Sequence, residues 1–370
     1  MRFEIDSRDP NSLARAGRLY TAHGVLRTPV FIASATHATV KGLSPEEVAH
    51  TGLQILAVNG YHLWLRPGLE PIVCAGGVHK YMHWKRPLLS DSGGFQVFSL
   101  AESRTITEEG VRFRSHIDGS PRFMTPELSI AVQNELGTDI AMSFDECVAH
   151  PSPREYVAES VELTLKWARR SKAAHRNPHQ HLFGIIQGGT FLDLRRRSAE
   201  ETVRIGFPGY ALGGLSVGEP QEEMLRVIAG TVPLLPEDRP RYVMGVGTPA
   251  DMLACLRLGI DIFDCVIPNK NARHGSVFVT GGELKIKNAR FREDLRPLDE
   301  TCDCEACRNY SRAYLRHLWM AKEPFGARLL TLHNLRHYAA FMERVRQAIA
   351  EGTLADVAQV GRSATDTGAA

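Results

Sequence analysis

Eight short apolar runs, each followed by a segment with helical periodicity, recur through the first 265 residues of this 370-residue chain. The runs are candidate strands at residues 29–33, 55–58, 87–90, 139–144, 182–186, 210–212, 242–245 and 260–264. Short apolar runs that alternate with helices are typical of βα units and a parallel sheet. Eight such units predict an α/β fold of the (β/α)8 TIM-barrel type, with the active site at the carboxyl ends of its strands. A doubly wound open sheet is the alternative.

Start and stop signals place helices between these runs. Thr125 and Thr248 each precede a proline, as expected for an N-cap hydroxyl followed by proline at the first helical position. Ser152 and Glu155 have the spacing of a capping box. The glycines at expected helix ends are Gly137, Gly206, Gly230 and Gly259.

Two segments interrupt the alternation of strands and helices. Residues 105–124, with a turn at Asp118-Gly119, predict a β-hairpin insertion, and residues 276–287 predict a second hairpin around Gly281-Gly282. A cysteine cluster and two helices, near 308–321 and 331–350, follow. The expected organisation is a catalytic barrel over 1–275, a subdomain over 276–350 whose last helix can complete the barrel, and a flexible tail over 351–370.

The composition is that of an ordinary globular enzyme, with 43% hydrophobic and 23% charged residues. The N-terminus has no apolar signal core and no stretch approaches membrane-span length, which predicts a cytoplasmic protein with no membrane partner. Charge is uneven, because residues 265–346 hold 15 basic against 9 acidic side chains. This excess favours a surface for a polyanion, although a solvated helical face explains it equally well.

Polar residues and glycines follow the predicted strands. They are Asn59, Gly60, Asp91, Ser92, Gly93, Gly94, Asp145, Gln187, Gly188, Gly189, Gly213, Gly214, Gly245, Gly247 and Asp264, with Val246 between two of the glycines. Glycines let a flat ligand approach the backbone closely. Asp145 and Gln187 suit the edge of a purine-like base, and Phe95 and Met244 could pack on its faces. Each could separately be a turn or core residue, but together they predict a base pocket.

Asp264 closes the last apolar run and is followed by a polar, basic segment at 269–275, predicted to be a loop. A buried carboxylate is costly and needs a reason. Two carboxylates across a sugar suit glycosidic-bond chemistry, in which one attacks C1′ and the other moves protons. Asp264 and Asp91 are the predicted pair, and their spacing does not say which one is the nucleophile. A turn cap is the alternative role for Asp264.

Three cysteines, Cys302, Cys304 and Cys307, lie within six residues, and His333 follows. Three thiolates and one imidazole saturate tetrahedral zinc, so the sequence predicts one structural Zn²⁺ per chain. His317 or His337 could replace His333 on spacing alone. The remaining cysteines, expected to be core thiols, are Cys74, Cys147, Cys255 and Cys265.

Over nearly its whole length the chain resembles the bacterial tRNA-guanine transglycosylases. The most specific matching segments are residues 91–98, 144–147, 184–189, 213–219, 242–247 and 263–266. The resemblance implies a zinc-binding barrel that exchanges guanine at wobble position 34 of GUN-anticodon tRNAs for a 7-deazaguanine, with no organic cofactor. It implies Asp264 as the nucleophile that forms a covalent enzyme–tRNA intermediate and Asp91 as the general acid/base.

The same resemblance implies which residues contact the ligands. The base-binding residues would be Asp91, Ser92, Gly93, Gly94, Phe95, Asp145, Cys147, Gln187, Gly214, Leu215 and Met244. The RNA-contacting residues would be Gly245, Val246, Gly247, Thr248, Pro249, Ala250 and Asp251, together with Asn269, Lys270, Asn271, Ala272 and Arg273. Cys147, Leu215 and Val217 match the bacterial pattern that accepts the small precursor preQ1 rather than queuine. Family members form homodimers partly through the zinc region, so a dimer is expected.

Some positions depart from the family pattern. Bacterial relatives usually read Pro-Thr-Arg-Asn-Ala-Arg-Asn-Gly after the nucleophile's strand, where this chain has Asn269, Lys270 and His274. Lysine supplies charge without the planar fork of arginine. Gly60 stands where threonine is usual. These departures bear on tRNA affinity. The alternatives are a queuine-accepting enzyme, a non-catalytic RNA-binding partner subunit, which would be expected to lack the two carboxylates, and a glycoside hydrolase, which would not explain the zinc ligands.

Overall fold

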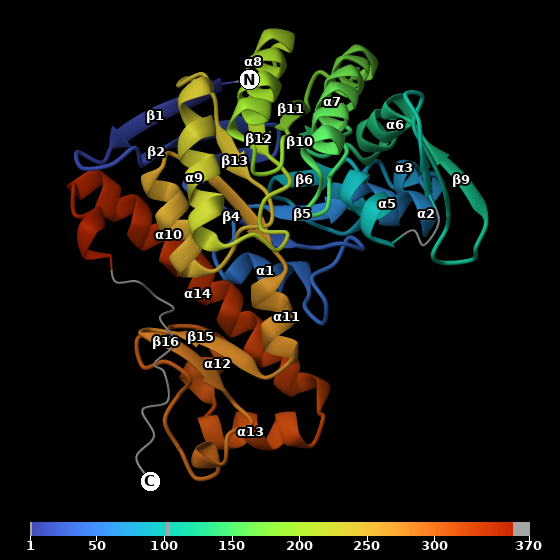
Figure 1. Cartoon of the computed structure of the whole chain (residues 1–370). Coiled ribbons are helices and arrows are strands. Elements are labelled where there is room, and N and C mark those ends of the chain that lie inside the picture. The colour runs from blue at the N-terminus through green and yellow to red at the C-terminus, as the bar shows by residue number, and fades with distance from the viewer. Residues whose placement is uncertain (1, 101–103, 358–370) are drawn as a thin grey trace.

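The protein, described here from a computed structural model covering residues 2–100 and 104–357, is built around a closed barrel of eight parallel strands (Figure 1). The barrel strands are β4 (Val30–Ser34), β5 (Leu56–Asn59), β6 (Leu88–Asp91), β10 (Ile140–Met142), β11 (His181–Ile186), β12 (Gly209–Leu212), β13 (Arg241–Val243) and β14 (Ile262–Cys265). They follow one another in chain order, and β14 pairs with β4 to close the ring. The predicted TIM barrel is therefore confirmed, and the open-sheet alternative is wrong.

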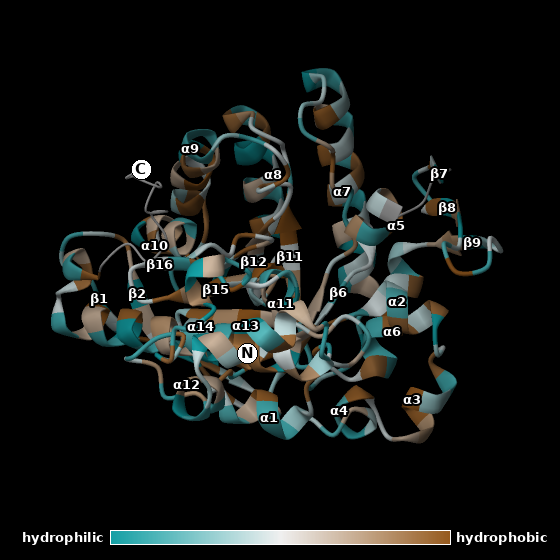
Figure 2. Ribbon diagram, turned by 90° about the horizontal axis from the view of Figure 1, so that it is seen from below, coloured by the Kyte–Doolittle hydropathy of each residue, from teal (hydrophilic) through white to brown (hydrophobic). Residues whose placement is uncertain are grey.

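Helices surround the barrel, with apolar strands at the centre (Figure 2). They are α1 (Pro45–His50), α2 (Gly60–Leu65), α3 (Glu70–Cys74), α4 (Val78–Tyr81), α5 (Gly94–Leu100), α6 (Pro126–Leu136), α7 (Arg154–Ala174), α8 (Leu192–Ile205), α9 (Gln221–Thr231), η1 (Val232–Leu234), α10 (Pro249–Arg257) and α11 (Ile267–Arg273). The predicted N-caps Thr125 and Thr248 are confirmed, because each side chain accepts a backbone N–H bond. The capping box at Ser152 is wrong: Pro153 is the N-cap, and the Ser152 hydroxyl donates to the Ala149 carbonyl.

Helix ends follow the glycine signals only in part. Gly137 and Gly206 are C-caps with positive φ, as predicted. Gly259, with φ of 91°, lies two residues beyond the end of α10, close to the predicted stop. Gly230 lies inside α9, because that helix continues to Thr231.

A three-stranded antiparallel sheet covers the amino end of the barrel, and the sequence patterns gave no sign of it. Its strands are β1 (Arg2–Arg8), β2 (Arg15–Thr21) and β3 (Gly24–Thr28). Leu19 and Leu26 from this sheet join inward-facing residues of the barrel strands, such as Ile32 and Phe183, in one buried cluster. The barrel interior is therefore a packed core that is closed at its amino end.

The first insertion is larger than the predicted hairpin. Strands β8 (Val111–Arg114) and β9 (Pro121–Met124) form the expected pair, and β7 (Arg104–Ile106) adds a third strand. The second hairpin, β15 (Ser276–Val279) with β16 (Gly282–Lys285), is confirmed. Of the four scattered cysteines, Cys255 and Cys265 are buried and Cys147 is half-buried, whereas Cys74 is exposed and is not a core thiol.

The C-terminal region extends from the barrel and returns to it. Its elements are η2 (Ala289–Phe291), α12 (Glu305–Asn309), α13 (Arg312–Met320), α14 (Pro324–Glu351) and η3 (Leu354–Asp356). Helix α14 begins at Pro324, earlier than predicted, and packs against β4 and α11 as well as α12, α13 and β15. Leu354 of the predicted tail is buried, and residues 358–370 lie outside the described residues. In the described part of the chain, no helix is both long and apolar enough to span a membrane.

A buried ion pair joins the amino-end sheet to the barrel. The Arg15 guanidinium on β2 binds both oxygens of Asp261, which directly precedes β14, with N···O distances of 2.8 and 2.6 Å. Both side chains are almost fully buried, and Asp261 also accepts the Arg241 N–H. Removing one partner of such a pair leaves an uncompensated buried charge.

We therefore expect Arg15→Met to lower the free energy of unfolding by about 3–5 kcal/mol, because Asp261 loses its counter-ion. Arg18→Met, which removes a half-exposed ion pair with Asp6 from the same strand, should cost less than about 1 kcal/mol. Urea unfolding of both variants measures the difference. Equal effects of the two substitutions would contradict a structural role for the Arg15–Asp261 pair.

Candidate active site

Side chains from strands far apart in sequence meet at the carboxyl end of the barrel. Asp91 is the last residue of β6, and Asp264 lies in β14. Asp145 lies three residues beyond the end of β10, and Gln187 directly follows β11. The charges of Asp264 and Asp145 both act on Asp91, so the three carboxylates share one site.

Asp264 accepts two hydrogen bonds through one of its carboxylate oxygens. Its Oδ1 accepts the Tyr242 hydroxyl at 2.6 Å and the Gly245 N–H at 2.9 Å. No described residue donates a hydrogen bond to Oδ2. Burial raises the pKa of Asp264, while the bonds from Tyr242 and Gly245 act in the opposite direction and favour the carboxylate.

Asp91 is held by the neighbouring strand β5 and the start of α2. The Asn59 side-chain amide donates to Oδ2, and the Gly60 N–H donates to Oδ1 at 3.2 Å. Burial raises the pKa of Asp91 to about 7, and the negative charge of Asp264 adds to this, whereas the Gly60 N–H lowers it. A carboxyl group with a pKa near neutrality can both give and take a proton.

Asp145, Gln187 and Ser92 form a connected polar group beside the two carboxylates. The Gln187 amide donates to Asp145 Oδ2 at 2.7 Å, and the Ser92 hydroxyl donates to Oδ1 at 3.3 Å. Burial raises the pKa of Asp145 to about 6, partly offset by these two bonds. Glycines keep the space open: a Cβ on Gly94 would lie 2.6 Å from the Asp145 carbonyl oxygen, and one on Gly213 would lie 2.6 Å from Gln187 Nε2.

The remaining residues predicted to bind the base line the same end of the barrel. Leu215 is buried, Gly214 and Cys147 are half-buried, and burial raises the pKa of the Cys147 thiol to about 12, so it stays neutral. Met244 packs on the barrel interior, whereas Phe95 in α5 is 52% exposed.

The predicted RNA-contacting residues after β13 form the first turn of α10 and the segment before it. Thr248 caps α10, and its hydroxyl donates to Asp251 at 2.6 Å. The Gly247 carbonyl accepts the Tyr338 hydroxyl of α14 at 2.7 Å. Gly245 is exposed, while Val246 and Pro249 are buried and Ala250 is half-buried.

The segment after Asp264 is a helix, and the expectation of a loop is wrong. Residues 267–273 form α11, in which Pro268 takes an early helical position that needs no N–H partner. Asn269 and Ala272 are buried, and the Asn269 side chain donates to the Ser34 carbonyl. Lys270 is exposed, and Asn271 and Arg273 are half-buried. Only part of this segment therefore faces outward.

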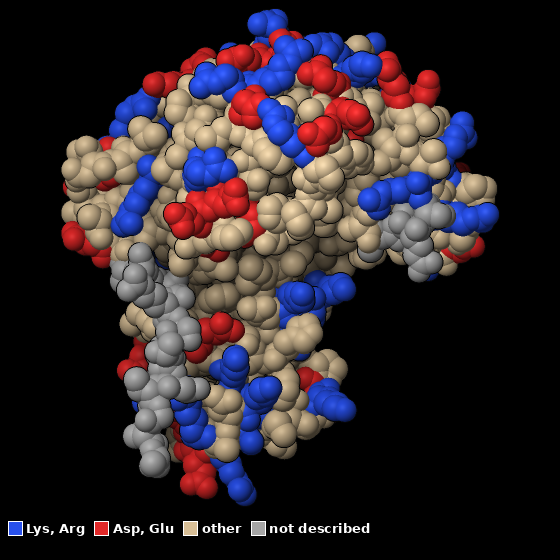
Figure 3. All heavy atoms as spheres, viewed as in Figure 1, with Lys and Arg blue, Asp and Glu red and all other residues tan. Residues whose placement is uncertain are grey.

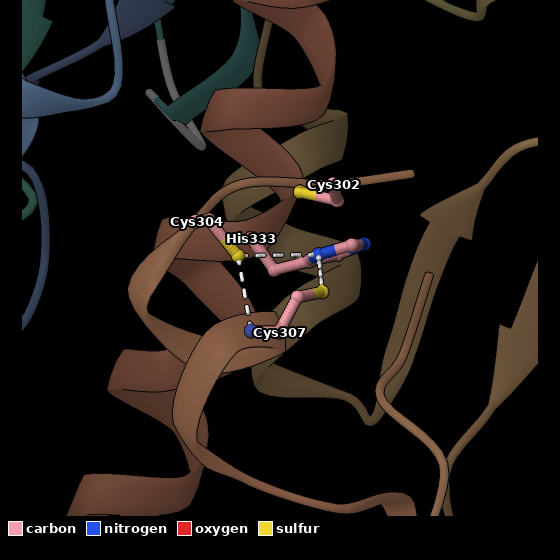
Figure 4. Close-up of side chains that lie close together, drawn as sticks. All are labelled: Cys302, Cys304, Cys307 and His333. Carbon is pink, nitrogen blue, oxygen red and sulfur yellow. Dashed lines mark hydrogen bonds between the residues drawn. The ribbon is translucent and has the colours of Figure 1, made fainter. Parts of the chain in front are cut away.

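The predicted metal ligands come together in the C-terminal region (Figure 4). The ligand atoms of Cys302, Cys304, Cys307 and His333 all lie within 4.8 Å of one another. His333 Nδ1 is 3.6 Å from Cys304 Sγ and 3.3 Å from Cys307 Sγ, close to the separations that tetrahedral coordination requires. Its Nε2 contacts the Phe278 carbonyl at 2.7 Å, which orients the ring. This cluster could hold a metal ion, and neither His317 nor His337 belongs to it.

Two residues that the sequence analysis did not single out shape the site. Tyr242 in β13 bonds Asp264, and both Tyr242 and Met244, which lies just beyond the end of that strand, pack in the barrel interior. Glu219, in a matched segment but without an assigned role, accepts the N–H groups of Ser216 and Val217 and holds the chain beyond Leu215.

The raised pKa of Asp91 makes stability depend on pH. Its folded pKa of about 7 lies above the unfolded value of about 3.9, so the folded protein keeps a proton that the unfolded chain loses. Stability therefore falls as pH rises between these values.

Asp91→Asn removes this pH dependence. The free energy of unfolding of the variant, relative to that of the parent protein, should therefore rise by on the order of 2 kcal/mol between pH 5 and pH 8, measured by urea unfolding. The exposed Asp238→Asn control should track the parent at every pH, and an Asp91→Asn curve that did so too would refute the shift.

Comparison with known proteins places this site within a family. The sequence profile described as queuine tRNA-ribosyltransferase matches residues 9–364. The queuine tRNA-ribosyltransferase of Symbiobacterium thermophilum is 56% identical over 357 residues, covering 96% of this chain and 89% of the relative. Those of Moorella thermoacetica and Listeria innocua serovar 6a are 55% and 52% identical, each over 96% of this chain and 95% and 94% of the relative. The chain belongs to the queuine tRNA-ribosyltransferase family.

Proposed function

We propose that this protein is a tRNA-guanine transglycosylase that exchanges guanine at wobble position 34 of GUN-anticodon tRNAs for preQ1 by double displacement. The observation that carries this proposal is that two neighbouring carboxyl groups differ in their hydrogen bonds and in their tendency to hold a proton. Asp264 receives two hydrogen bonds that favour its anion, whereas burial and a like charge hold the pKa of Asp91 near 7. One group suits nucleophilic attack and the other suits proton transfer.

The free oxygen of Asp264 would attack. Because Tyr242 and Gly245 both bond Oδ1, Oδ2 is the oxygen available to C1′ of the guanosine. The C1′–N9 bond breaks as the Asp264–C1′ ester forms, and Asp91 gives its proton to the departing guanine. In the second step Asp91 takes a proton from the incoming base, whose N9 attacks C1′ and releases Asp264.

The polar group of Asp145, Gln187 and Ser92 would recognise the edge of the base. A carboxylate can accept N–H bonds from a guanine-like ring, and an amide can donate to its carbonyl. Phe95 and Met244 would pack on the two faces of the ring. A wobble base turned out of its loop fits a pocket of this kind, with its single-stranded neighbours held outside.

The anticodon loop would lie across the hollow between the barrel and the C-terminal region, where Lys and Arg atoms stand at the rim (Figure 3). The segment from Gly245 to Asp251 and the outward residues of α11 would contact it. Lys270 is the exposed cation of α11, so it supplies charge to the phosphates without the bidentate geometry of arginine. Buried Asn269 and Ala272 would instead position the helix.

Several finer assignments belong to the same proposal. Cys147, Leu215 and half-buried Val217 favour the small preQ1 over queuine. The ion in the Cys₃His cluster would be structural Zn²⁺, since four protein ligands leave no open position. A second copy of this chain would cover the aromatic group of Tyr310, Tyr314 and Phe325, in which Tyr314 is 41% exposed. Cytoplasmic location stays a prediction.

Guanine exchange tests the nucleophile. With a GUN-anticodon tRNA and radiolabelled guanine, Asp264→Asn should lose at least about a thousandfold in rate, because no carboxylate remains to form the ester. Asp91→Asn should lose about 10²–10⁴-fold. Asp193→Asn, a carboxylate paired with Arg154 on the outer helices, is the matched control and should match the parent.

A denaturing gel of enzyme and tRNA should show a covalent adduct for the parent that preQ1 releases and queuine does not. Exchange that persists in Asp264→Asn would refute the nucleophile. Comparable release by the two bases would leave the nucleophile standing and refute the preQ1 preference.

Metal removal tests the structural ion. Cys304→Ser should lose one equivalent of zinc per chain and lower the Tm by on the order of 5–10 °C, because the metal joins α12 to α14. Exposed Cys74→Ser controls for loss of a thiol and should change neither value. Unchanged zinc content in Cys304→Ser, measured by atomic emission, would count against the Cys₃His assignment.

A further inference from the structure

A second compact group of metal-ligating side chains lies at the amino end of the barrel, away from the strand ends that carry Asp91 and Asp264. His23 stands in the turn between β2 and β3, His79 lies in α4, and Asp139 directly precedes β10. Their ligand atoms lie within 4.8 Å of one another, as in the Cys₃His cluster. Neither the glycosidic chemistry nor the base pocket uses them.

The geometry suits one ion facing a carboxylate. His23 Nδ1 lies 3.0 Å from Asp139 Oδ1, and His79 Nε2 lies 3.1 Å from Asp139 Oδ2. Two ligands each about 2.0–2.2 Å from one ion stand about 3.3–3.6 Å apart at a tetrahedral angle, so each nitrogen would move only a few tenths of an ångström away from its carboxylate oxygen. The backbone already fixes the carboxylate, because Asp139 accepts the N–H groups of His23 and Leu88, each at 2.9 Å.

His79 supplies an independent indication. It is only 8% exposed, and its Nε2 makes no hydrogen bond with any residue in the described ranges. That nitrogen is near Asp139 but is poorly directed for a hydrogen bond, although the distance allows an ionic contact. A buried polar atom without a hydrogen-bond partner is costly, and a metal ion in line with its lone pair would remove that cost.

The two histidine rings are stacked, so one of them must turn before both can bind a single ion. His23 and His79 stack with centroids 3.6 Å apart and planes 15° from parallel. The lone pair of an imidazole nitrogen lies in the plane of its ring, so two nearly parallel rings do not direct their lone pairs at the same point. A turn of the His23 ring, which is 38% exposed, would let both imidazoles bind one cation, with Asp139 balancing part of its charge.

We propose that His23, His79 and Asp139 form a second metal site for a divalent first-row transition ion such as Zn²⁺. Two imidazoles and one carboxylate leave a position for water on the side of half-exposed His23. The ion would join the β2–β3 turn, α4 and β10. In a TIM barrel this end serves stability rather than catalysis, so the site is structural.

Metal counting on the full chain tests the proposal. Protein stripped with a chelator and reloaded with Zn²⁺ should hold two equivalents per chain, measured by atomic emission after buffer exchange. His23→Ala and His79→Phe should each hold one; His79→Phe keeps the ring volume and removes the lone pair. His179→Ala removes an exposed histidine just before β11, at the same end, and should hold two.

Co²⁺ separates the two sites by chemistry. Thiolate-to-cobalt absorption reports the Cys₃His cluster and should be unchanged in the histidine variants, while the dissociation constant of the second equivalent should rise at least about tenfold. If His79→Phe does not fold, His23→Ala decides, because its side chain lies at a partly exposed turn. One equivalent in the parent protein, or a second equivalent retained in both variants, would overturn the proposal and leave a metal-free His–Asp–His contact.

Discussion

The pairing of β14 with β4 is the constraint on which the rest of the structure depends. It joins the last barrel strand to the first, with Asp264 opposite Ile32 and Cys265 opposite Ala33. Asp264 lies more than 170 residues from Asp91 along the chain, and this ladder closes the ring that holds both at one end of the barrel. Closure sets both carboxylates at one mouth and seals the barrel interior, so fold and site are completed by the same set of hydrogen bonds.

Closure also brings three acidic groups into a poorly solvated space, where each accepts hydrogen bonds from different donors. Asp264 is bonded by a hydroxyl and a backbone N–H, Asp145 by an amide and a hydroxyl, and Asp91 by an amide and an N–H. Burial raises the pKa of all three, and the negative charges of Asp264 and Asp145 raise the pKa of Asp91 further. The three carboxyl groups therefore differ in proton affinity because each lies at a different place around the barrel mouth.

The barrel could be predicted because parallel strands covered by helices are apolar on both faces and stand out as short runs. The amino-end sheet could not, since β1 holds only exposed and half-buried residues and has no apolar run. The sequence predicts a loop in place of helix α11 because most of its residues are polar, although Asn269 and Ala272 are buried in the structure.

The carboxylates and the metal cluster were predictable from residue type and position. The partners of Asp264 were not, because Tyr242 becomes a donor only through the pairing of β13 with β14. The third strand of the first insertion likewise depends on contacts with β8 that no local pattern encodes. The division at residue 275 stays a prediction.

Helix α14 contacts elements on both sides of that division. One turn carries His333 to the metal cluster, and five residues further on Tyr338 bonds the Gly247 carbonyl at the barrel mouth. The same helix packs on β4 and on α11, so a chain that ended at residue 275 would leave both elements without this contact. An exchange of the metal-binding region between related chains would therefore also replace the helix that packs on the barrel.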